Sequence, residues 1–155
     1  HNQFNIAYLS NELNSSVAVL KLDDSEPTVT KTRLSLAQQL SSKNPQASTQ
    51  ANYVSEIALS KDQRFLYVAN RGLDTLAVFN VDSSTGRLRY QSSIETNGHC
   101  PRHFAITPCN RFIIVANQDS NSITVFAINA HTGDLTIKHT LANIGSPNYI
   151  TILER

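Results

Sequence analysis

The feature that most constrains this chain is an internal repeat of 47 residues. Residues 64–71 read RFLYVANR, and residues 111–118 read RFIIVANQ. The match continues downstream in the same register, because LAVFNVD at 76–82 corresponds to ITVFAIN at 123–129. Since chance does not keep one register over consecutive segments, we interpret the chain as a repeat protein.

Two incomplete copies flank these repeats. An earlier copy aligns residues 5–12 with residues 64–71, at a separation of 59 residues. The polar stretch Gln38 to Gln50 lengthens one connection, and we interpret it as an insertion between units that is open to proteolysis. Residues 145–152 begin a final copy.

Each copy contains short segments rich in Val, Ile, Leu, Phe and Tyr, separated by polar turns. Their partial alternation is typical of strands buried between stacked sheets. Four antiparallel strands recurring roughly every 40 to 50 residues form the blade of a β-propeller. A β-sandwich also has short strands, but it does not predict a repeat in constant register. We therefore predict an all-β fold made of four-stranded propeller blades.

The repeat also predicts how the chain is divided. With strands named A to D from the central channel outward, it reads B-C-D, A-B-C-D, A-B-C-D and A. These units are an incomplete blade with its linker (1–50), two blades (51–97 and 98–144) and a closing inner strand (145–155). About four blades is the usual minimum for a closed ring. We expect the ring to be completed by missing upstream blades, or else by another copy of the chain; the start at His1 and the lack of Met favour upstream blades.

Composition excludes several classes of function. The net charge is +1 and 16% of residues are charged, which argues against a nucleic-acid partner or electrostatic membrane binding. No apolar run has the length of a bilayer span. Cys100 and Cys109 make neither a disulfide framework nor a metal site, and we expect two reduced, partly buried thiols. No Gly-x-Ser-x-Gly elbow and no phosphate-binding glycine loop occurs.

The directions of the strands predict where a functional site would lie. In an antiparallel blade, the start of strand A and the end of strand B lie at the same end of the channel. Arg102 and His103 stand at the start of an A strand, and Glu12, Arg71 and Gln118 follow three successive B strands. The last three occupy one repeat position yet are an acid, a base and an amide. The residues alone leave two interpretations open, a functional site or a set of solvated turn residues.

The residue just before this position is an asparagine in every copy. Asn11, Asn70 and Asn117 do not vary, whereas a position used for chemistry diversifies from blade to blade. We therefore predict a structural role, in which the side chain caps the turn between strands B and C.

Motifs ordered along the whole chain carry a family resemblance. They are NEL (11–13), LYVANRG (66–72), GHCPRHF (98–104), VANQ (115–118) and two Thr-Gly-x-Leu turns (85–88 and 132–135). With them the chain resembles the lactonase-type seven-bladed propellers. This family includes the propeller form of 6-phosphogluconolactonase and the fungal carboxy-muconate lactonising enzyme. The resemblance implies that the chain is about the last three-sevenths of such a ring.

The resemblance also implies roles for single residues. Glu12 matches the family's channel-facing glutamate and Arg71 its arginine after the B strand, while Arg102 and His103 match a Pro-Arg-x-Phe segment. We expect Glu12 to act as acid or base and Arg71 to stabilise an anion or oxyanion. Arg102, His103 and Gln118 are expected to position the substrate. No metal or other cofactor is implied.

The implied reaction is hydrolysis of a sugar lactone such as 6-phosphogluconolactone by the full-length protein, in the cytoplasm. The family also uses a histidine and a further arginine in upstream blades, which have no counterpart here, so we expect the chain alone to be inactive. Two alternatives stay open: a lactonising cycloisomerase acting on an unsaturated diacid, and a propeller that only binds a partner.

Overall fold

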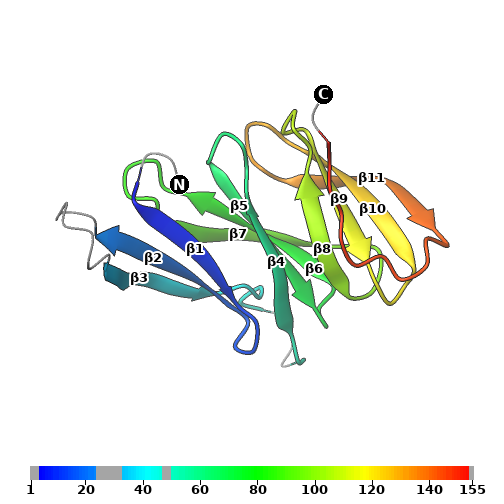
Figure 1. The fold of residues 1–155 in the computed structure, drawn as a ribbon, viewed down its shortest axis with the longest axis horizontal. Coiled ribbons are helices and arrows are strands. Elements are labelled where there is room, and N and C mark those ends of the chain that lie inside the picture. The colour runs from blue at the N-terminus through cyan, green and yellow to red at the C-terminus, as the bar shows by residue number, and fades with distance from the viewer. Residues whose placement is uncertain (1–3, 24–32, 47–49, 154–155) are drawn as a thin grey trace.

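The structure is a computed structural model that describes residues 4–23, 33–46 and 50–153. The described residues form strands and connecting turns, arranged as three sheets that stand side by side (Figure 1). The strands are β1 (Ile6–Asn11), β2 (Ser16–Asp23), β3 (Arg33–Ser41), β4 (Tyr53–Leu59), β5 (Phe65–Arg71), β6 (Thr75–Val81), β7 (Leu88–Glu95), β8 (Pro101–Ile106), β9 (Phe112–Asn117), β10 (Ser122–Ile128) and β11 (Leu135–Ala142).

Every sheet is an antiparallel meander in chain order. The first sheet holds β1 to β3, the second β4 to β7 and the third β8 to β11. Strand pairing is antiparallel throughout, for example with Phe65 opposite Asn80 and Asn70 opposite Thr75. The predicted all-β fold of antiparallel blades is therefore confirmed, with three, four and four strands in the successive sheets.

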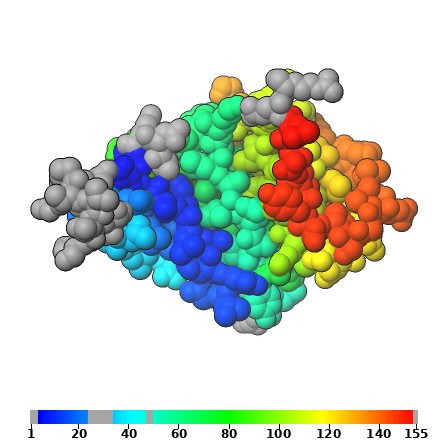
Figure 2. Space-filling view, viewed as in Figure 1, coloured from blue at the N-terminus to red at the C-terminus, as the bar shows by residue number. Residues whose placement is uncertain are grey.

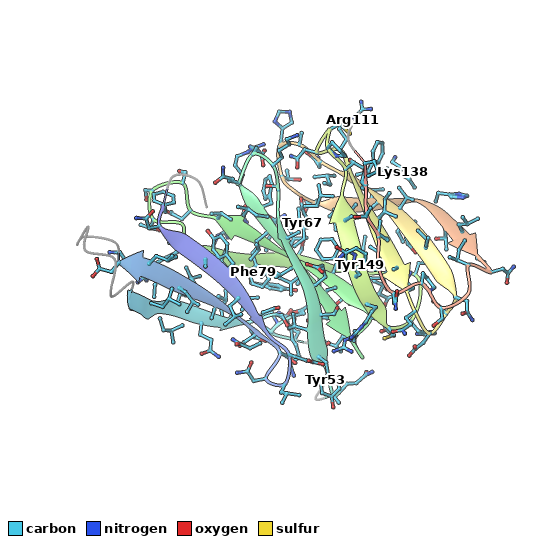
Figure 3. All side chains as sticks on the ribbon, viewed as in Figure 1. Tyr53, Tyr67, Phe79, Arg111, Lys138 and Tyr149 are labelled. Carbon is cyan, nitrogen blue, oxygen red and sulfur yellow. The ribbon has the colours of Figure 1, made fainter. Side chains whose placement is uncertain are left out.

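The hydrophobic core lies between the sheets, because each sheet buries the faces that meet its neighbours. In β5, Leu66 and Val68 pack towards the first sheet, whereas Tyr67 and Ala69 pack towards the third. Phe79 of β6 belongs to the first of these layers, and Figure 3 labels it together with Tyr67. Since the middle sheet is covered on both sides, β5 reads as an almost unbroken apolar run.

The repeated asparagine has the structural role that the sequence predicts. In the first two sheets its side-chain amide spans the turn after strand B, from Asn11 to Ser16 Oγ at 3.0 Å and from Asn70 to Thr75 Oγ1 at 3.3 Å. Asn70 also donates to the carbonyl of Ser42, in the connection that follows the first sheet, at 3.0 Å. The asparagine therefore fixes the turn and ties neighbouring blades together.

The predicted insertion from Gln38 to Gln50 is only partly right. Gln38 to Ser41 belong to β3, whose polar side chains are tolerated because an outer strand needs backbone pairing more than apolar burial. The Gln38 amide donates to Leu88 O and its Oε1 accepts from Leu88 N, each at 2.8 Å. The longer connection runs instead from 42 to 52, of which 47–49 lie outside the described residues.

The C-terminal segment 143–153 crosses from the end of β11 to β8 without forming a strand, although the sequence predicts an inner strand over 145–155 (Figures 1 and 2). A strand requires a hydrogen-bonded partner strand, and this segment belongs to none of the three described sheets. The segment is held by turn contacts, such as the 2.7 Å bond from Ser146 N to Asn121 Oδ1. That it closes a ring stays a prediction, and residues 154–155 lie outside the described part.

Candidate functional site at the B-strand ends

The predicted site residues gather at one end of the sheets. Arg71 ends β5 and pairs with Tyr53 at the start of β4. Glu12 follows β1 directly, and Gln118 follows β9. Tyr53 marks this end in Figure 3, and Arg111 marks the opposite end. The antiparallel geometry therefore brings the B-strand ends and A-strand starts to one edge, as expected.

Glu12 and Arg71 meet across the boundary between the first and second sheets. A guanidinium Nη2 of Arg71 donates to Glu12 Oε1, which forms an ion pair. The Arg71 side chain is 18% exposed, whereas that of Glu12 is 56% exposed. Arg71 Nε is buried and has no hydrogen-bond partner among the described residues. The pair thus keeps a shielded cation at the edge of the sheet, with donor capacity left over.

A second acid–base pair, which the sequence reasoning missed, joins the second and third sheets. His103 Nε2 lies 3.1 Å from Glu56 Oε2, and the two side chains are 14% and 31% exposed. Glu56 lies on β4 and His103 on β8, and each sits at an irregularity in the pairing of its strand. The 47-residue repeat aligns these two positions. A comparison of equivalent residues in the A strands, like the one made for the B-strand ends, could therefore have found the pair.

The C-terminal segment contacts this histidine. The backbone N–H of Ile150 donates to His103 Nδ1 at 3.2 Å, and the Tyr149 ring lies 4.1 Å from the imidazole, centroid to centroid. Because Nδ1 accepts a hydrogen bond, the proton of the neutral ring sits on Nε2 and points to Glu56. His103 is therefore a fixed hydrogen-bond donor in this arrangement.

Arg102 and Gln118 do not contact the Glu12–Arg71 pair directly. Arg102 is exposed at the irregularity of β8, and Gln118 donates its backbone N–H to Cys100 O at 3.0 Å. Cys100 lies near both residues. Burial and the charge of Asp119 raise the pKa of the Cys100 thiol, whereas the charges of Arg71 and Arg102 act to lower it. The structure thus groups both residues around Cys100, and their expected role in substrate positioning stays a prediction.

Comparison with known proteins assigns the family. Residues 1–152 match the family described as lactonase, 7-bladed beta-propeller. The chain belongs to this lactonase family. It is 35% identical over 108 residues to the 6-phosphogluconolactonase of Bacillus subtilis, matching 70% of this chain but 29% of that protein.

Solved structures agree with the lactonase family and its fold. The periplasmic gluconolactonase PpgL of Pseudomonas aeruginosa superposes with a TM-score of 0.82 at 33% identity, covering 94% of this chain and 38% of that one. A protein from Lactobacillus plantarum gives 0.83 at 32%, covering 92% and 40%. The chain therefore spans about 30–40% of its relatives and is part of a seven-bladed propeller.

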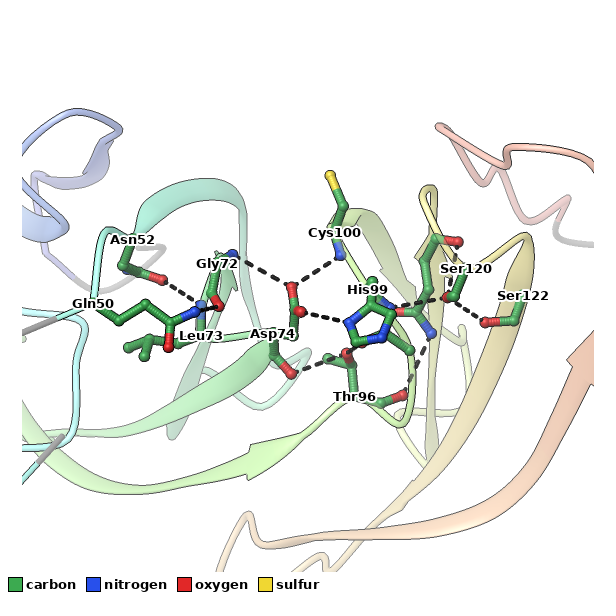
Figure 4. Close-up of polar contacts among 12 residues, drawn as sticks. Gln50, Asn52, Gly72, Leu73, Asp74, Thr96, His99, Cys100, Ser120 and Ser122 are labelled. Atoms are coloured by element: carbon green, nitrogen blue, oxygen red, sulfur yellow. Dashed lines mark hydrogen bonds and ion pairs between the residues drawn. The ribbon is translucent and has the colours of Figure 1, made fainter. Parts of the chain in front are cut away.

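A polar cluster at the same end of this lactonase-family chain holds the start of β8 (Figure 4). Asp74 Oδ1 accepts from Cys100 N at 2.9 Å, and Asp74 Oδ2 lies 2.9 Å from His99 Nδ1. Asp74 has a positive φ of 52°, and Asn121, at the same repeat position, has 51° and bonds to Ser146 in the same manner. Because the arrangement recurs, we interpret Asp74 as a structural link between blades.

Other features bear on ligands only weakly. An open pocket at the opposite end of the sheets, lined among others by Lys21 and Arg87, lies away from the predicted residues. No group of three or more His, Cys, Asp or Glu that could hold a metal occurs among the described residues. In that same part of the chain, no helix is long and apolar enough to cross a membrane.

Cys109 is exposed, not partly buried as expected, because it lies in the turn after β8.

Proposed function

We propose that the complete protein containing this chain hydrolyses a sugar lactone that carries an anionic group, such as 6-phosphogluconolactone. The observation that carries the proposal is the Glu12–Arg71 pair, because it places a shielded guanidinium and a carboxylate together at one end of a lactonase-family propeller. Two relatives, a 6-phosphogluconolactonase and a gluconolactonase, support a lactone substrate.

The chemistry divides between the two side chains. Glu12 takes a proton from water as the water oxygen bonds to the lactone carbonyl carbon. Arg71 stabilises the negative charge that develops on the carbonyl oxygen, or on the anionic group of the substrate, with N–H donors that Glu12 does not use. The ring C–O bond then breaks, the ring oxygen accepts the proton from Glu12, and the product is a hydroxy acid.

The site proposed here needs the rest of the ring. The Glu12–Arg71 pair and the neighbouring inner strands β4 and β8 are proposed to form one side of it, and upstream blades to supply the other side together with further substrate contacts. We expect the 155-residue chain by itself to be inactive for this reason. The cytoplasmic location is likewise a proposal.

Turnover assays on the complete protein test this function. 6-Phosphogluconolactone and carboxymuconate are offered separately, and spontaneous lactone hydrolysis is subtracted using protein-free samples. Accelerated ring opening of the lactone alone supports the proposal. Turnover of carboxymuconate alone would instead identify a cycloisomerase, and turnover of neither would favour a propeller that only binds a partner.

A further inference from the structure

The Glu56–His103 pair keeps a carboxylate on the innermost strand of the second sheet. Glu56 Oε1 accepts the backbone N–H of Ile57 at 3.1 Å, and Oε2 lies 3.1 Å from His103 Nε2. In both contacts the carboxylate oxygen is the hydrogen-bond acceptor. A carboxylate has about four lone-pair positions, which leaves roughly two of them unused.

His103 restrains this carboxylate from the neighbouring sheet. Its side chain is 14% exposed, its Nδ1 accepts from Ile150 N at 3.2 Å, and the Tyr149 ring lies against it. The imidazole therefore cannot turn freely, and Glu56 is held where its remaining acceptors are open at 31% exposure. The result is a fixed, negatively charged acceptor rather than a mobile surface carboxylate.

The pair lies further along the inner strand than the Glu12–Arg71 pair. Tyr53 is opposite Arg71, and Glu56 follows Tyr53 by three residues, which at about 3.3 Å per residue is roughly 10 Å or less. Arg71 reaches towards the first sheet and Glu56 towards the third. A cation and an anion thus lie on either side of the inner edge of the second sheet, at the same end of the molecule.

We infer that Glu56, positioned by His103, is a specificity residue that accepts hydrogen bonds from the hydroxyl groups of a ligand whose anionic group binds Arg71. The inference rests on the proposed function and narrows its substrate class. In a lactone with one anionic end and one hydroxyl-bearing end, the anionic group pairs with Arg71 and the hydroxyl groups donate hydrogen bonds to Glu56. A diacid that carries a carboxylate at each end meets like charge at Glu56, and this repulsion disfavours its binding.

Equilibrium binding to the complete protein tests this inference without requiring turnover. The probes are glucose 6-phosphate, which has one anionic group and several hydroxyls, and muconate, which has a carboxylate at each end and no hydroxyl. The variant Glu56→Gln keeps the size of the side chain and removes its charge. Glu95→Gln is the matched control, because Glu95 is an exposed carboxylate at the end of the outer strand β7.

The wild type is expected to bind glucose 6-phosphate more tightly than muconate. Glu56→Gln should raise the Kd for glucose 6-phosphate about 10-fold, the loss expected for a hydrogen bond to a charged group, and should lower the Kd for muconate. Glu95→Gln should change neither. His103→Gln should weaken glucose 6-phosphate binding while the discrimination against muconate persists, because the charge of Glu56 remains.

Several results overturn the inference. A wild type that prefers muconate or binds neither probe contradicts it whatever the variants do, even if Glu56→Gln does not fold. A Glu56→Gln protein whose preference stays within about twofold of wild type contradicts it as well. The lactonase assay is read separately, so turnover with an unchanged preference would retain the proposed function and reject the role of Glu56.

Discussion

Glu12 and Arg71 occupy the same position at the ends of two successive B strands, and they form an ion pair between neighbouring sheets. The repeat therefore does more than stack identical units. It places side chains of opposite charge at equivalent points, so that adjacent blades bring them together at one end of the sheets. Glu56 and His103 repeat this arrangement between the next two sheets, on the inner strands.

The first prediction concerns Arg71 and lactone hydrolysis. Arg71→Ala in the complete protein should lower kcat/KM for 6-phosphogluconolactone by about 10²–10³-fold, the cost of removing one oxyanion-stabilising donor group. Arg71→Lys should restore part of the loss, since it keeps the charge but not the guanidinium fork. Arg111→Ala is the control, because Arg111 lies at the opposite end of the sheets (Figure 3). Equal losses for Arg71→Ala and Arg111→Ala would count against the assigned role.

The second prediction concerns Asn70 and stability. The Asn70 side chain is fully buried and accepts from Ser42 Oγ at 2.7 Å and from Asn52 Nδ2 at 3.0 Å, besides donating to Ser42 O. Asn70→Ala should lower the free energy of unfolding by about 2–3 kcal/mol, because buried partners are left unsatisfied. Asn11→Ala, at the half-buried equivalent position, should cost about 1 kcal/mol or less. Denaturant titration measures both, and equal costs would contradict the proposed tie between blades.

The third prediction concerns the turn at Asp82. Hydrogen bonds from the Ser84 and Thr85 side chains and backbone lower the pKa of Asp82 to about 2. Because the folded pKa lies below the unfolded one, this stabilisation is present above about pH 4 and is lost as the pH falls towards 2. Asp82→Asn should keep the turn, as Asn129 does at the equivalent position, but should lower Tm because the charge is lost. Asp82→Ala should lower Tm more than Asp82→Asn, because it also removes the acceptor oxygen.

Thermal unfolding at several pH values measures this effect. The difference in Tm between wild type and Asp82→Asn should be largest near pH 7 and should shrink below pH 4. A difference that is constant from pH 7 to pH 2 would show that the charge of Asp82 does not act through these hydrogen bonds.

The fourth prediction concerns the two thiols. Cys109 is exposed, and hydrogen bonding to the Thr107 side chain and the Arg111 backbone lowers its pKa to about 7, whereas burial raises the pKa of Cys100. Since the thiolate is the reactive species, iodoacetamide at pH 7 should modify Cys109 first. Thr107→Val should slow that reaction at pH 7. Peptide mass spectrometry follows both sites, and faster labelling of Cys100 would contradict this account.

The repeat register made much of the fold predictable. It predicted which residues of β5 and β9 correspond, that Asn70 is structural, and which ends of the strands lie together. These are properties of strand direction and turn chemistry, which a sequence records locally. The contact between Glu12 and Arg71 could not be predicted from these local properties, because it depends on how two sheets pack.

Other features could not be predicted from pattern alone. Gln38 to Ser41 look like a linker because they are polar, yet backbone pairing with β2 and the hydrogen bonds of Gln38 to Leu88 hold them in β3. Glu56 and His103 share a repeat position, which the sequence does show, but the contact between them depends on how the second and third sheets pack. The buried, unpartnered Nε of Arg71 likewise depends on packing around it.

The most direct test of the account is a crystal structure of the complete protein with glucose 6-phosphate bound. The account predicts the phosphate group within hydrogen-bond distance of the side-chain nitrogens of Arg71, with sugar hydroxyls directed to Glu56. A phosphate bound elsewhere, for instance beside Arg87 at the opposite end of the sheets, with Arg71 still paired only to Glu12, would contradict it.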